Sequence, residues 1–91
     1  MLSFKSFDEV VERANNNDLG LCSYIYTNSM DKAHRASELM ETGCVAVNTP
    51  TVAIAEAPFG GIKQTGYGRE GGSMAIKDYL NIKYTHLGLK T

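Results

Sequence analysis

The stretch Leu21–Asn48, LCSYIYTNSMDKAHRASELMETGCVAVN, holds two short apolar runs on either side of a segment with helical spacing. The first run, Leu21–Thr27, is rich in β-branched and aromatic residues, and the second, Cys44–Asn48, is nearly continuously apolar. Both runs are expected to be strands. A strand, a helix and a strand with short joints form a βαβ unit, whose strands should be parallel and whose crossover should be right-handed. The sequence therefore predicts an α/β fold built on part of an open parallel sheet.

A helix is expected before this unit, in the segment SFDEVVERANNND. Ser6 and Glu9 have the spacing of a capping box, which satisfies free N–H groups at a helix start. The Asn-rich run 15–18 and Gly20 favour turns and should end the helix. Its apolar residues recur at intervals of three and four, as one face of a helix requires. They are Phe7, Val10, Val11 and Ala14.

The helix inside the βαβ unit has signals at both ends. Asn28 or Ser29 can cap its start, and Gly43 has the place of a C-cap glycine. Its apolar positions fit one helical face, although not perfectly. They are Met30, Ala33, Ala36, Leu39 and Met40.

The chain after Asn48 continues as a long loop, TPTVAIAEAPFGGIKQTGYGREGG. A loop of this length is usually functional or packs against something outside the domain. Ser73 could cap a short helix, MAIKDYL, and the last segment, Asn81–Leu89, has the composition of a strand. Nothing downstream can pair with that strand, so we expect an exposed edge or an arm for a partner.

Length and composition limit the function classes. The 91 residues make one domain at most, and the net charge of −1 comes from nine basic and ten acidic residues spread along the chain. This distribution does not favour binding to nucleic acid or to a membrane surface. No apolar run is long enough to cross a membrane, and the first residues lack the apolar core of a secretory signal. The expected location is the cytoplasm.

Cys22 and Cys44 lie in apolar segments, outside any C-x-x-C motif or cysteine–histidine cluster. We interpret them as reduced, buried, small apolar residues, with a disulfide as the less favoured alternative. His34 and His86 are far apart and have no cluster of acidic residues or cysteines near them, so no metal site is expected. No serine or cysteine has a recognisable base nearby, so no catalytic triad can be assembled.

The glycines Gly66, Gly68 and Gly71 spell the dinucleotide fingerprint G-x-G-x-x-G. That fingerprint works only directly after a strand and at the start of a helix, with an acidic residue about 20 positions further on. The preceding residues, GGIKQT, are not strand-like, so the favoured interpretation is that the glycines allow positive φ and close packing. Charged neighbours could also form a site, although we expect them to be solvated or paired with one another. They are Lys63, Arg69 and Glu70.

The order of several motifs resembles the C-terminal end of an NAD(P)-dependent aldehyde dehydrogenase. The motifs are SFDEVVERANNNDLGLCSYIYT, GCVAVN, APFGGIKQTGYGREGG and DYLNIKY. The resemblance runs from about Phe4 to Leu89, and its most specific part is the string from Pro58 to Glu70. The similarity is closest to the succinate-semialdehyde dehydrogenase branch. In this family the glycine string is a structural loop beside the substrate tunnel, not the pyrophosphate site.

The resemblance implies that two parts of the chain have different roles. Residues 1–80 correspond to the C-terminal part of the catalytic domain, and residues 81–91 to a strand or arm for oligomerisation. Phe59 matches an aromatic residue near the reacting aldehyde, and Ala53 matches a position at the tunnel mouth. Succinate-semialdehyde enzymes have a serine there that holds the substrate carboxylate. Ala53 offers no hydroxyl, which favours a less polar or differently anchored aldehyde.

The resemblance also implies what the chain lacks. The family's nucleophilic cysteine, its general-base glutamate and its dinucleotide domain all lie upstream of the matching region. No catalytic, cofactor-binding or metal-binding residue is therefore assigned to this chain. The full-length enzyme would use NAD or NADP to oxidise an aldehyde, by closest resemblance a semialdehyde, to a carboxylic acid through a cysteine thiohemiacetal and thioester. The chain alone is expected to bind no cofactor and to be inactive.

Two other functions stay open from the sequence. The chain could be a non-catalytic interaction module that binds another copy, or the remainder of the enzyme, through residues 81–91. It could also be a small phosphate- or nucleotide-binding protein that uses Gly66–Gly72.

Overall fold

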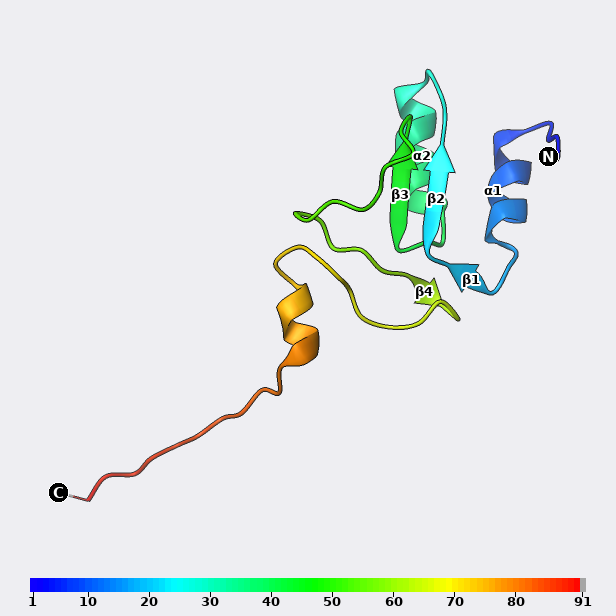
Figure 1. The fold of residues 1–91 in the computed structure, drawn as a ribbon. Coiled ribbons are helices and arrows are strands. Elements are labelled where there is room, and N and C mark those ends of the chain that lie inside the picture. The colour runs from blue at the N-terminus through cyan, green and yellow to red at the C-terminus, as the bar shows by residue number, and fades with distance from the viewer. Residues whose placement is uncertain (91) are drawn as a thin grey trace.

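The computed structural model describes residues 1–90 and shows a small α/β unit from which a long C-terminal segment extends (Figure 1). Strands β2 (Cys22–Ile25) and β3 (Cys44–Val47) are parallel, in the register Cys22↔Cys44 to Ile25↔Val47. Helix α2 (Met30–Leu39) connects them. The predicted βαβ unit is therefore confirmed.

Helix α1 (Phe7–Asn15) precedes the unit and begins at the predicted cap. The hydroxyl of Ser6 accepts a hydrogen bond from the backbone N–H of Glu9, with an N···O distance of 3.1 Å. The carboxylate of Glu9 accepts from the N–H of Lys5 at 2.8 Å, one residue before the position that a standard capping box uses. Arg35 of α2 lies over the ring of Phe7, 4.7 Å from its centroid, and so connects the two helices.

The expected C-cap role of Gly43 is wrong. Helix α2 starts at the expected cap, Ser29, but it ends at Leu39, and Met40 leaves it in an extended conformation. Gly43 lies against the backbone of Gly60, and a Cβ atom at Gly43 would collide with the carbonyl oxygen of Gly60. This glycine is therefore needed for a close crossing of two backbone segments and not for a left-handed helix end.

The core of the unit is small. The buried apolar residues are Ala33 and Ala36 of α2 and Ala46 of β3. The buried hydroxyl of Ser23 shares a hydrogen bond of 2.9 Å with the hydroxyl of Thr42, so it does not remain unpaired. Many larger apolar side chains lie on the surface. They include Leu19, Tyr24, Tyr26, Met30, Ile54, Tyr67, Ile76 and Leu80.

The long loop after β3 folds back onto the start of the unit. Strand β4 (Ile62–Lys63) pairs antiparallel with β1 (Leu19–Gly20), and Phe59 forms an isolated bridge with Glu70. The sequence did not predict β1 or β4, because two-residue strands are too short to show an alternating pattern. The segment is thus a structured loop that is attached at two points.

The C-terminal part departs from one expectation and agrees with another. The short helix is a 3₁₀-helix, η1 (Ala75–Tyr79), and its cap is Met74 without a side-chain bond, so the capping role of Ser73 is wrong. Residues 81–90, here called the arm, are extended but pair with no strand among residues 1–90. This agrees with the expected exposed arm, and its pairing with a partner stays a prediction, because a strand forms only where a neighbouring edge accepts its hydrogen bonds. Thr91 lies outside the described residues.

The arm determines the overall shape. The molecule measures 75 × 24 × 20 Å, and its radius of gyration is 19.0 Å. A compact domain of this length would have a radius of gyration of about 12 Å. Figure 1 shows the arm leading straight away from the βαβ unit. Among residues 1–90, none of the helices has both the length and the apolar character needed to cross a bilayer.

Candidate functional site

The glycine-rich segment uses its own N–H groups to close the loop. Phe59 and Glu70 exchange two backbone hydrogen bonds of 2.7 Å each, and the N–H of Gly72 donates to the carbonyl of Ala55 at 2.8 Å. The N–H of Arg69 donates to a carboxylate oxygen of Asp78 at 2.8 Å. These N–H groups are therefore bonded within the chain and are not free to bind a phosphate.

The glycines themselves confirm the conformational interpretation. Gly66, Gly68, Gly71 and Gly72 all have positive φ, at 117°, 85°, 69° and 63°. A Cβ atom at Gly68 would lie 2.9 Å from the carboxylate of Asp78, so this glycine lies directly against a negative charge. The segment follows a two-residue antiparallel strand, and the next helix, η1, has five residues. These residues do not fit the pyrophosphate of NAD or NADP, and the phosphate-binding hypothesis loses its structural basis.

The three charged residues Lys63, Arg69 and Glu70 do not come together in one charged site. Nη1 of Arg69 donates to the carbonyls of Gly61 and Gly68, at 3.0 and 2.7 Å. Lys63 makes its contacts elsewhere in the fold, and no ion pair among residues 1–90 joins Lys63 or Arg69 to Glu70. The expectation that these residues are solvated or paired with one another is wrong for both cations, because each binds backbone carbonyls.

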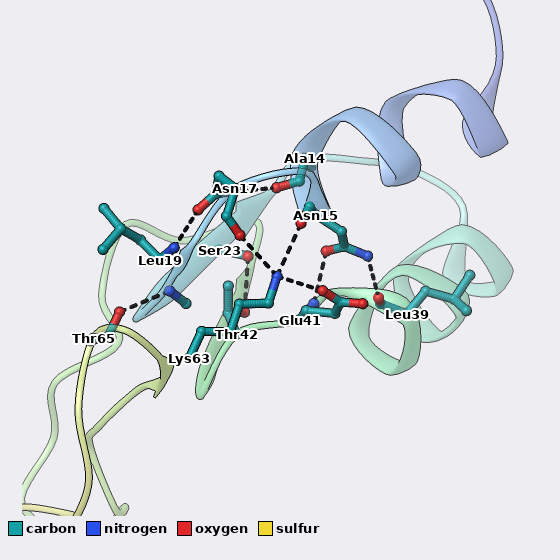
Figure 2. A network of polar contacts seen from close by, with 11 residues as sticks. Ala14, Asn15, Asn17, Leu19, Ser23, Leu39, Glu41, Thr42, Lys63 and Thr65 are labelled. Atoms are coloured by element: carbon teal, nitrogen blue, oxygen red, sulfur yellow. Dashed lines mark hydrogen bonds and ion pairs between the residues drawn. The ribbon is translucent and has the colours of Figure 1, made fainter.

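Lys63 is the centre of a polar network that joins three elements (Figure 2). Its Nζ donates to the carbonyls of Asn15 and Asn17, at 3.0 and 3.2 Å, and lies 2.5 Å from the carboxylate of Glu41. The side chain of Asn15 in turn accepts from the N–H of Glu41 at 2.9 Å and donates to the carbonyl of Leu39 at 2.8 Å. The network attaches the end of α1 and the β4 strand to the turn that follows α2.

Lys63 also has an unusual backbone conformation. Its φ is 57°, which costs about 1 kcal/mol or more for a residue with a side chain. The bonds of Nζ offset this cost, because they place the cation at the C-terminal end of α1, where carbonyls are free and the helix dipole is negative. Sequence patterns did not reveal the contact, since the partners are 46 and 48 residues away.

Asn48 fixes the point from which the loop leaves the sheet. Its φ is 56°, a conformation that asparagine tolerates better than most residues. Its side-chain oxygen accepts from the N–H of Thr27 at 2.9 Å, and its amide nitrogen donates to the carbonyl of Thr27 at 3.0 Å. The carboxyl ends of β2 and β3 are thereby held side by side. The sequence signal for this contact is an asparagine directly after an apolar strand.

The two residues assigned to the substrate tunnel lie in different surroundings. Phe59 is half-buried and lines a hollow of about 510 Å³ together with Leu21, Arg69 and Tyr79. Ala53 is exposed on the loop between β3 and the Phe59–Glu70 bridge. Ala53 does not contribute to the wall of that hollow.

Titratable groups that could carry chemistry are few. Cys22 and Cys44 are free thiols and half-buried, less deeply than expected. Burial, together with the neighbouring Cys44, raises the pKa of the Cys22 thiol. His86 contacts the hydroxyl of Tyr84 at 3.2 Å, and no group of three metal-binding side chains exists among residues 1–90.

Comparison with known protein families finds one family whose profile matches most of this chain. The sequence profile of the aldehyde dehydrogenase family covers residues 1–85. The chain belongs to the aldehyde dehydrogenase family. This aldehyde dehydrogenase segment is 51% identical to 3-sulfolactaldehyde dehydrogenase of Pseudomonas putida, over 97% of this chain and 18% of the relative. It is 42% identical to the NADP(+) succinate-semialdehyde dehydrogenase of Escherichia coli K12, over 98% of this chain and 18% of the relative.

Solved structures of the family have the same fold. The NAD+ complex of an aldehyde dehydrogenase from Bacillus cereus superposes with a TM-score of 0.89 at 39% identity, and the match covers 98% of this chain and 18% of that one. A coverage of 98% includes the arm, so the extended course of this segment has a counterpart in that structure. The chain spans about a fifth of the length of these relatives, which fits the resemblance to a C-terminal segment.

Proposed function

We propose that this chain acts as the C-terminal part of an enzyme that oxidises an aldehyde to a carboxylic acid with NAD or NADP. Residues 1–80 would complete the catalytic domain and supply part of the substrate-tunnel wall. Residues 81–91 would be the oligomerisation arm. The chain alone would be inactive and bind no cofactor. A reducing compartment such as the cytoplasm suits its two free thiols.

The arm is the observation that carries this proposal. Its apolar side chains are exposed, with Ile82 at 102% and Tyr84 at 84% of the reference area. An extended segment with free N–H and C=O groups and apolar side chains is the form in which a chain adds a strand to another sheet. The loop before the arm closes with its own hydrogen bonds, which supports treating the arm as a separate element.

The substrate class follows from the tunnel positions and the relatives. Three of the similar enzymes are named for 3-sulfolactaldehyde, succinate semialdehyde and glutarate semialdehyde, which are aldehydes with an acidic group, whereas retinal dehydrogenase 2 of Homo sapiens, 43% identical, is named for an apolar aldehyde. We infer an aldehyde with an acidic group as the substrate here, with Phe59 beside the reacting end and Ala53 at the mouth. Because Ala53 has no hydroxyl, the acidic group would be anchored by residues outside this chain.

A chimera tests the catalytic part of the proposal. The matching C-terminal segment of the E. coli succinate-semialdehyde dehydrogenase is replaced by this chain, and steady-state rates are measured with succinate semialdehyde. We expect an active chimera, in which Ala53→Ser lowers KM without a comparable change in kcat. Phe59→Ala should lower kcat/KM by about tenfold or more, because the aldehyde loses a positioning wall. An inactive but folded chimera would contradict the proposal, and a KM that is insensitive to residue 53 would contradict the place of Ala53 at the tunnel mouth.

The exposed arm also favours a second function, a non-catalytic interaction module. The chain and a version that ends at Leu80 are compared by light scattering after gel filtration. Both functions predict that the full chain forms assemblies and that the shorter version is monomeric. An active chimera separates the two, because an interaction module has no need of a functional tunnel wall. Equal masses for both versions would contradict the role of the arm.

A further inference from the structure

The two cysteines of the chain are direct neighbours across the parallel β2–β3 ladder. Cys22 and Cys44 are register partners, although 21 residues separate them in the sequence. Adjacent strands lie about 4.8 Å apart, which falls within the Cα separations of about 4.4–6.8 Å that a disulfide can span. Paired residues of neighbouring strands project from the same face of a sheet. Both sulfur atoms are therefore on the same side, at the same height.

The surroundings of the pair leave it accessible. Both cysteines are half-buried, and Tyr24, which projects from the same face of β2 as Cys22, is 51% exposed. The Sγ of Cys44 lies 3.5 Å from the carbonyl oxygen of Gly60, to which it donates. Burial and Cys44 raise the pKa of Cys22 and so lower its thiolate fraction, which slows its attack on peroxide; the closeness of the two sulfur atoms, not thiol acidity, makes the site. A small oxidant can reach a pair of this kind, while a bulky one is hindered.

We propose that Cys22 and Cys44 are a modification site at which hydrogen peroxide forms a reversible cross-strand disulfide. In the first step one sulfur attacks the peroxide, the O–O bond breaks, and a sulfenic acid and one water are formed. In the second step the other sulfur attacks the sulfenic sulfur, the S–O bond breaks, and a second water leaves. The two thiols lose two electrons and two protons in total, and the peroxide is reduced to water.

The disulfide would close β2, α2 and β3 into one covalent ring. A cross-link between distant residues restricts the unfolded chain, so oxidation should raise the denaturation midpoint of the βαβ unit. A dithiol reductant should reverse the change. The inference concerns only residues within the βαβ unit and does not depend on the proposed enzymatic function.

Peroxide treatment of the full 91-residue chain tests the proposal. Dilute protein is exposed to hydrogen peroxide at neutral pH and analysed by mass spectrometry before and after trypsin digestion. We expect a monomer that has lost two hydrogens, with peptide 14–32 joined to peptide 36–63. The variants Cys22→Ser and Cys44→Ser should each lack this product. A wild-type chain that mainly gains oxygen atoms, or that forms covalent dimers, would overturn the proposal.

A second measurement separates the effect of the fold from mere proximity in the sequence. The same oxidation is carried out in guanidinium chloride, where the strand register is lost. The intramolecular disulfide should then form at least about tenfold more slowly, because only the folded chain holds the sulfur atoms together. Equal rates in the native and the denatured chain would show that the β2–β3 ladder does not create the site, and would overturn the proposal.

Discussion

The βαβ unit with its glycine loop and the arm differ in how they satisfy their backbone groups. In the unit, β2 pairs with β3, β1 with β4, and Phe59 with Glu70. The arm pairs with no strand among residues 1–90, and its apolar side chains are exposed. The same chain thus combines a part that closes on itself with a part whose backbone can bond only to something else. Apolar composition alone does not distinguish them, since both contain isoleucine, leucine and tyrosine.

The largest loss of stability is predicted at Gly43, where the backbone of the βαβ unit lies against Gly60 of the glycine loop. Gly43→Ala should lower the free energy of unfolding by about 3 kcal/mol, because the new Cβ atom meets the backbone of Gly60, which cannot rotate away. Urea denaturation followed by circular dichroism measures the change. Gly88→Ala in the arm is the matched control, since a Cβ atom there meets open space. Equal effects at both positions would remove the distinction between the two regions.

The second largest loss of stability is expected at Asn48, whose two hydrogen bonds to Thr27 hold the carboxyl ends of β2 and β3 together. Asn48→Ala removes two hydrogen bonds to Thr27 and leaves a side chain at positive φ, for a loss of about 2 kcal/mol. Asn48→Gly removes the same bonds without the strain, so its loss should be about 1 kcal/mol. The two variants are compared by thermal unfolding. A glycine variant less stable than the alanine variant would contradict the role of the backbone conformation.

The polar network around Lys63 should contribute less to the free energy of unfolding than the contacts of Gly43 and Asn48. Lys63→Met keeps the aliphatic stem and removes the cation, and we expect a loss of about 1 kcal/mol. The contribution is modest because Glu41 is 54% exposed and solvent screens the ion pair. The difference from wild type should shrink as salt is raised. Lys83→Met in the arm serves as the control and should change nothing. A loss at Lys83 as large as that at Lys63 would contradict this assignment.

The smallest effect on stability is expected in the arm itself. Ile82→Ala should change the free energy of unfolding by less than about 0.5 kcal/mol, because the side chain is fully exposed in the single chain. The same substitution should weaken self-association, which analytical ultracentrifugation measures. A large loss of stability in dilute, monomeric protein would show that the arm packs on its own chain.

Much of the fold could be predicted from local patterns. The apolar runs at Cys22 and Cys44, the helical spacing between them and the caps at Ser6 and Ser29 are all determined by nearby residues. The pairing of β1 with β4 could not be predicted from the sequence, because two-residue strands carry no periodic signal. Gly43 was assigned to a helix end because the pattern does not show which distant backbone will pass close to a glycine.

The candidate site was less accessible to sequence reasoning. Positive φ at Gly66 and Gly68 followed from residue type, and the fingerprint was discounted for lack of a strand and a helix around it. The contacts of Lys63 and Asn48 depend on residues distant in the sequence, and only the folded chain brings them together. The roles of Ala53 and Phe59 come from the family resemblance and stay predictions.

Hydrogen–deuterium exchange of the full chain, read by mass spectrometry at increasing protein concentration, tests the difference between the two regions most directly. At low concentration, peptides from β2 and β3 should be protected, while peptides from residues 81–90 should exchange at once. As concentration rises, the arm alone should gain protection, because its backbone groups bond to another copy. Protection of the arm that is already complete in the monomer, or an arm that stays unprotected in the assembled protein, would contradict the account.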